Sequence, residues 1–159
     1  MCGFVLSRLG PHDPFMNEQR SGRGQLMGGP LAPVWPTFRA LCETFVPEAA
    51  ELDTAGWKRL AEIAGSGLET RPPGVQRQVV LLVRLLDGLS LLRHGRRLRN
   101  LSGGQRGHFL DSLQHSRLLL LRRGVWGLRT LAFMGYYARS EIHPEIGYRA
   151  SPRGWEAVR

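Results

Sequence analysis

Lysine is almost absent from this chain: Lys58 is the only one, although the net charge is +9. Arginine therefore carries nearly all of the positive charge. A strongly basic balance is typical of proteins that bind nucleic acid or a membrane surface. Arginine in place of lysine, together with abundant glycine and alanine, also fits a GC-rich genome and a basic surface without a polyanionic partner. We favour this second interpretation.

Cysteine is scarce, and metal-ligand patterns are lacking. Cys2 and Cys42 form no C-x-x-C pair, and the five histidines are scattered without a metal-ligand spacing. We therefore predict neither a disulfide framework nor a metal site. Cys42 falls on the apolar face of an expected helix, a position typical of a buried structural thiol.

Long apolar runs are missing as well. The most apolar stretch, Val79–Leu92, contains Arg84 and Asp87 and is shorter than the roughly 20 residues that a bilayer requires. The first residues contain no apolar segment of secretory length and no twin-arginine pair before one. We predict no transmembrane segment, no export signal and a cytoplasmic location.

What the sequence does contain is helical periodicity, which begins after a stretch rich in helix breakers. Residues 1–33 are rich in glycine, proline and arginine and show no period, so we interpret them as a flexible tail. Residues 34–159 show helical patterns and no convincing strand. The sequence predicts a single all-α domain, a bundle of about five helices.

The first two expected helices have recognisable limits. Apolar residues recur at i, i+3, i+4 and i+7 over Phe38–Phe45, which is one helical stripe, and Pro47 ends it. A second helix is expected to begin with Asp53 or Thr54 as its cap. The glycines of Gly65–Gly67 are expected to stop it.

Three further helices are expected along the rest of the chain. One runs from Pro72 and Pro73 to His94 and is apolar on most sides, so we predict that it is the central helix of the bundle. A basic stretch then breaks at Gly95. A fourth helix is expected over residues 102–123 and a fifth over residues 125–140.

The stretch Leu101-Ser102-Gly103-Gly104-Gln105 spells the LSGGQ box of ABC-type ATPases. That box acts on a nucleotide bound by a P-loop, and Lys58 has no glycine loop before it. Ser102 followed three residues later by Gln105 is a capping box. We therefore predict the start of a helix here and no nucleotide site.

Positive charge is concentrated in one segment. Arg93 to Arg129 holds nine arginines and one acid, Asp111, whereas Arg39 to Glu69 holds twice as many acids as bases. One interpretation is a basic face for RNA, DNA or an acidic protein. The other is a solvated helix surface with some arginines paired to the acidic first half. No stacking aromatics interleave the arginines, so we favour the second interpretation and regard nucleic acid as the less favoured partner.

The C-terminal third is crowded with aromatic side chains. Tyrosine and tryptophan combine a large apolar area with a polar tip, which suits a protein interface. They equally suit a cover for the end of the bundle itself, and composition does not separate the two. Paired carboxylates, a G-x-S-x-G elbow and a Cys–His dyad are missing, so the chain is not expected to be an enzyme.

The order and spacing of three stretches resemble the gluconate 2-dehydrogenase subunit 3 family. They are ALCETFVP (Ala40–Pro47), FLDSLQHSRLLLLRRGVWGLRTL (Phe109–Leu131) and MGYYARSEIHPEIGYRASPRGWE (Met134–Glu156). These are small helical subunits that accompany flavin dehydrogenases of the glucose–methanol–choline type. Many of them carry a twin-arginine export signal, which this chain lacks, so an export role is in doubt.

The resemblance implies a non-catalytic partner of a large dehydrogenase. FAD would lie on the large subunit and not on this chain, and a cytochrome or iron–sulfur subunit is a further partner in such complexes. The small subunit would assist the folding, stability or export of the large one. The resemblance places at structural or subunit-contact positions Cys42, Pro47, Met134, Tyr136, Tyr137, Gly147, Tyr148 and Trp155.

Overall fold

The computed structural model describes residues 29–147, and every regular element within this range is a helix. This confirms the all-α prediction and the number of α-helices. Short 3-10 helices are η1 (Ala32–Val34), η2 (Pro47–Glu51) and η3 (Leu98–Asn100). The five α-helices are α2 (Trp35–Phe45), α3 (Thr54–Glu69), α4 (Pro73–His94), α5 (Gly103–Gln114) and α6 (Leu119–Tyr137).

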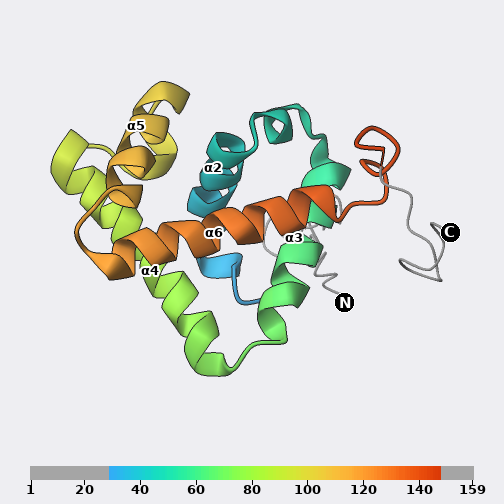
Figure 1. Cartoon of the computed structure of the whole chain (residues 1–159), viewed down its shortest axis with the longest axis horizontal. Coiled ribbons are helices and arrows are strands. Elements are labelled where there is room, and N and C mark those ends of the chain that lie inside the picture. Colours follow the sequence, from blue (N-terminus) through green and yellow to red (C-terminus); the bar gives the residue numbers. More distant parts are fainter. Residues whose placement is uncertain (1–28, 148–159) are drawn as a thin grey trace, which may run out of the picture.

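Helix α6, not α4, is the central helix. It runs across the middle of the molecule and packs against α2, α3, α4 and α5 (Figure 1). Only Val83, Leu86 and Ser90 are buried on α4, although that helix is the longest of the five. The prediction of a central third helix was wrong because α4 packs on the bundle with one side only. Partly buried against the core are Val79, Val80, Leu82 and Leu89, whereas Leu81, Leu85, Leu91 and Leu92 remain exposed.

The core lies between α2, α3 and α6, with up to three side chains from each of the other elements. Phe38, Leu41 and Cys42 of α2 are fully buried, as the helical stripe predicts. Burial, and secondarily the charge of Glu43, raises the pKa of the Cys42 thiol, so this cysteine stays protonated. The structure confirms a buried free thiol at this position.

Helix α3 begins at the predicted cap but ends later than predicted. The Asp53 carboxylate accepts a hydrogen bond from the Gly56 amide at 2.7 Å and caps the helix. The helix then continues through Gly65–Gly67 to Glu69, contrary to the predicted stop. A side chain at Gly67 would meet the end of Met134, so this glycine serves the packing of α3 on α6 and not a helix end.

The predicted fourth and fifth helices are divided at a different place. Helix α5 ends at Gln114, and α6 begins at Leu119 and includes Gly124. In the connection, the Leu118 amide donates to the Ser116 hydroxyl at 3.1 Å, and Leu118 itself is extended. The Ser116 side chain thus replaces a helical backbone acceptor, a competition to which serine is prone.

The folded part also begins slightly earlier than the predicted boundary at residue 34. Leu31 belongs to the core with 4% of its surface exposed, and its carbonyl accepts from the Val34 amide at 3.0 Å. Residues 29–33 are therefore not part of a flexible tail. Leu31 is surrounded in the sequence by glycines and prolines, so no helical period predicts its burial.

The LSGGQ stretch is a helix start with a complete capping box. The Gln105 amide donates to the Ser102 hydroxyl at 3.3 Å, and the Ser102 amide donates to the Gln105 side chain at 3.2 Å. Two of the four orphan amides at the start of α5 are thereby satisfied. The glycines at 103 and 104 occupy this first turn.

The variant Ser102→Ala is expected to lower the free energy of unfolding by about 1 kcal/mol, because it removes the capping acceptor. Urea denaturation followed by far-UV circular dichroism measures the change. Ser66→Ala is the matched control, since the Ser66 hydroxyl donates only to the Ile63 carbonyl within α3. Equal stability of the two variants would show that the capping box contributes nothing.

Candidate functional site

The two predicted structural or contact residues of the first half lie apart: Cys42 is buried, and Pro47 is exposed. Cys42 has no exposed area, so its place is structural and it contacts no partner. Pro47 is the first residue of η2 and follows the end of α2, where its ring prevents continuation of the helix. Neither residue offers a functional group to a ligand.

The aromatic residues at the end of α6 are divided between core and surface. Tyr136 is 7% exposed; its ring lies edge-on to Tyr137, and the Arg139 guanidinium lies 4.4 Å above it. Burial raises the pKa of the Tyr136 phenol, and the Arg139 charge opposes this. Met134 and Tyr137 are exposed. Tyr136 therefore covers the end of the bundle, whereas Met134, whose side-chain end lies against Gly67, and Tyr137 remain partly exposed, so the interface interpretation stays a prediction.

Two of the predicted residues, Tyr148 and Trp155, lie outside the described residues. Gly147 is the last described one, with a φ of +67°, a left-handed conformation that favours glycine. It closes a turn by donating to the Pro144 carbonyl at 3.2 Å. The resemblance implies a structural or subunit-contact position for this glycine, and the turn is compatible with the structural one.

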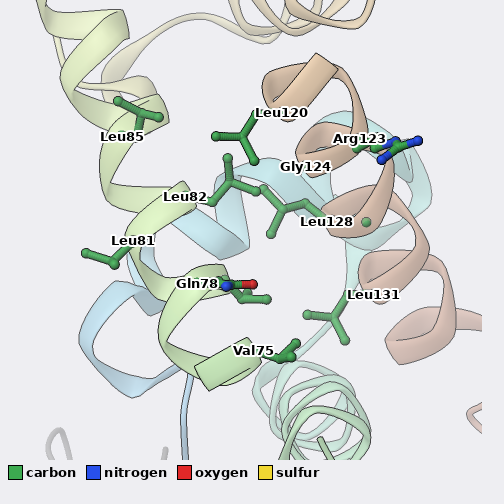
Figure 2. A pocket seen from close by; sticks show the side chains of 12 residues that line it. Val75, Gln78, Leu81, Leu82, Leu85, Leu120, Arg123, Gly124, Leu128 and Leu131 are labelled. Carbon is green, nitrogen blue, oxygen red and sulfur yellow. The ribbon is translucent and has the colours of Figure 1, made fainter. Parts of the chain in front are cut away.

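An apolar groove lies between α4 and α6 and is called here the α4–α6 groove. It has a volume of about 570 Å³, within the range of small-molecule sites. Among its lining residues only Gln78 and Arg123 carry polar side chains (Figure 2). The lining residues are Val75, Gln78, Val79, Leu81, Leu82, Leu85, Leu120, Arg123, Gly124, Gly127, Leu128 and Leu131.

Two glycines of α6 shape this groove in different ways. A Cβ at Gly124 would lie 2.6 Å from Leu82 Cδ2, so the absence of a side chain lets α4 and α6 approach closely at this point. A Cβ at Gly127 would meet nothing within 4 Å, although this residue lines the groove. The two helices thus touch at Gly124 and leave unfilled space beside Gly127.

The rim of the groove exposes large apolar side chains. Leu81 is 61% exposed and Leu120 is 76% exposed, and they project from opposite helices (Figure 2). Single exposed leucines are common, but here Val75, Leu85 and Leu120 join Leu81 around one hollow. Apolar residues gathered around one hollow make this groove the candidate binding site.

The charged side chains that line the groove and one adjoining hollow are all arginines. Arg123 lines the groove, and the adjoining hollow, which shares Leu81, is lined by Arg77 and Arg84. No aspartate or glutamate lines either hollow. Within the described part of the chain, no carboxylate lies within 4.0 Å of these three guanidinium groups.

The arginine-rich segment is partly neutralised from inside the protein. Arg106 of α5 pairs with Glu43 of α2 at 3.6 Å, as expected for a link to the acidic first half, and Arg97 pairs with Asp87 at 3.7 Å. The Arg129 guanidinium lies 5.1 Å from the Phe133 ring. Seven of the nine arginines are exposed: Arg93, Arg96, Arg97, Arg99, Arg117, Arg122 and Arg123.

Sequence reasoning missed the groove, although a signal for it was present. The apolar character of α4 on most sides predicted complete burial, but a helix in a bundle of this size buries one stripe. Its second apolar stripe, which includes Leu81 and Leu85, therefore stays exposed and lines the groove. The contribution of α6 was not visible, because Leu120 lies in a run of four leucines with no period of its own.

Metal-site and membrane-span features are absent from the part of the chain that the structure describes. No group of three or more His, Cys, Asp or Glu side chains is placed to hold a metal ion there. Within residues 29–147, every helix is too short or too polar to span a bilayer. No family model, curated protein or solved structure matches the chain.

Proposed function

We propose that this chain is a non-catalytic helical subunit that binds a larger protein, a FAD-dependent dehydrogenase, and stabilises it. The observation that carries the binding role is the α4–α6 groove. Its exposed leucines cost free energy in water, about 25 cal/mol for each Å² of apolar surface that a partner would cover. A surface of this kind is retained where something binds to it.

The identity of the partner rests on the resemblance to the gluconate 2-dehydrogenase subunit 3 family. The residues that carry this resemblance at the end of α6 include Met134 and Tyr137, which are exposed. They are available to extend an interface beyond the groove. FAD would be bound by the large subunit, and this chain would supply apolar contact area.

Purification of the tagged chain from its source organism under mild conditions tests this function. We expect a stoichiometric yellow partner of flavin-dehydrogenase size, identified by mass spectrometry and by absorbance in the flavin bands. The partner is expected to be less thermally stable when the small chain is removed, because the bound form is favoured by mass action. Recovery of a stable chain alone, with the dehydrogenases left in the unbound fraction, would contradict the proposal.

The exposed arginines favour a second candidate function, a basic helical module that binds nucleic acid. Such binding would weaken steeply as the salt concentration rises, because each neutralised phosphate releases counterions. The same purification distinguishes it. Nucleic acid that leaves the chain on treatment with salt or nuclease would support this alternative, whereas a flavoprotein that stays bound in moderate salt would not.

A further inference from the structure

We propose that the α4–α6 groove binds one amphipathic helix of a partner protein, with leucine-like side chains facing the groove and acidic residues along its flanks. The inference rests on the proposed function and names the element of the partner that docks. It commits to a partner helix in place of a second copy of this chain.

The length of the groove fits a helix of about three turns. Its lining residues run from Val75 to Leu85 on α4 and from Leu120 to Leu131 on α6. At 1.5 Å per residue, each side is about 15 Å long, which corresponds to roughly three turns. A helix of this length presents apolar anchors at i, i+3 or i+4, and i+7, the spacing of the helix-in-groove mode of recognition.

The lining explains why the anchors are aliphatic. The groove narrows where Gly124 meets Leu82 and has free space beside Gly127. Leucine or methionine side chains adapt to such a hollow and would cover Leu81 and Leu120, which now project into solvent. An occupant with a polar face toward the groove would leave its own polar groups without hydrogen-bond partners.

Charge complementarity argues for acidic flanks and against a second copy. Arg123 lies in the groove, and Arg77 and Arg84 lie in the adjoining hollow, with no acidic residue lining either. Carboxylates on a docked helix would pair with these guanidinium groups. A symmetric dimer through the same face would instead bring two sets of arginines together, and like charges across an interface are unfavourable.

Selection from a peptide library tests this directly. The probe is a displayed library of helical peptides of about 18 residues, with random residues at both the apolar and the flanking positions. It is presented to the full chain. We expect enriched sequences to carry leucine-like residues at the anchor spacing and an excess of aspartate and glutamate at the flanks. Their affinity is expected to fall as salt rises, because exposed charge pairs are screened.

Matched variants locate the binding. The double variant Leu81→Asp/Leu120→Asp is expected to weaken the selected peptides about tenfold or more, as for removal of central anchors. Leu92→Asp/Leu118→Asp changes two exposed leucines outside the groove by the same charge and is expected to leave affinity unchanged. A Cβ at Gly127 would meet nothing within 4 Å, so Gly127→Leu places a side chain in the groove and is expected to weaken the peptides. Gly88→Leu, on α4 outside the groove, is its control and is expected to leave affinity unchanged.

Each outcome decides. Peptides with neutral or basic flanks, no enriched helical sequence, or equal loss in the groove and control variants would overturn the inference. A concentration-dependent dimer in analytical ultracentrifugation that disappears in the groove variants alone would also overturn it, because a second copy would then be the occupant.

If a flavoprotein co-purifies equally with the groove variants, the docking inference fails and the proposed function stands. If acidic peptides bind in a groove-dependent way but no flavoprotein is recovered, the docking inference stands and the proposed function fails.

Discussion

The variant Phe38→Ala is expected to lower the free energy of unfolding by about 3–5 kcal/mol, the largest stability effect of any single change considered for this protein. Phe38 lies on α2 with no exposed area, in contact with the Trp35 ring at a centroid distance of 5.9 Å. Alanine would leave a cavity between helices that pack on α6, and the surrounding side chains close such cavities only in part. A domain of this size has about 5–15 kcal/mol of stability in total, so a large share would be lost.

Urea denaturation followed by far-UV circular dichroism measures this change. Leu92→Ala is the control: Leu92 is 86% exposed, and its truncation is expected to alter stability by no more than about 0.5 kcal/mol. Phe38→Leu restores most of the volume and should recover more than half of the loss. A Phe38→Ala variant as stable as Leu92→Ala would mean that α2 does not pack as the structure has it.

Features decided by local chemistry could be predicted from the sequence. The stripe over Phe38–Phe45, the Asp53 cap and the capping box at Ser102 each depend on residues within one or two helical turns. A side chain that satisfies an orphan amide of its own helix needs no knowledge of the rest of the fold. All three are found where the pattern placed them.

Features that depend on tertiary contacts could not be predicted from the sequence. Gly65–Gly67 resembles a helix stop, yet α3 continues through it. The absence of a side chain at Gly67 makes room for the end of the Met134 side chain of α6. The break at Ser116 has no strong signal, and Gly124, which does resemble one, lies inside α6 against Leu82. In each case a residue far along the chain decides the role of the glycine.

The candidate site shows the same division. The sequence shows that α4 has more apolar residues than one buried face requires. Whether the additional residues are buried depends on which helix lies at the centre of the bundle. Once α6 takes that place, Leu81 and Leu85 remain exposed and line a groove in place of the core. Hydrophobic pattern thus predicts that a face is covered and leaves open whether the chain itself covers it.

The variant Gly135→Val is expected to lower the free energy of unfolding by about 2–3 kcal/mol, even though valine is the better helix former. Gly135 is buried where α6 crosses α3, and a Cβ there would lie 3.1 Å from the Leu60 backbone carbonyl and 3.2 Å from Leu60 Cγ. A backbone atom of a packed helix has no rotamer by which to withdraw. The two further methyl groups of valine would therefore force the helices apart.

Gly67→Val provides the matched control at the same α3–α6 contact, and both variants are measured by thermal and urea denaturation. There the obstructing atoms belong to the end of the Met134 side chain, which is exposed and flexible and moves aside at little cost. Its change is expected to stay within about 1 kcal/mol, because relief of the helix penalty of glycine offsets the rearrangement. Equal losses in the two variants would mean that α3 and α6 are separated by side chains on both sides and do not meet at their backbones.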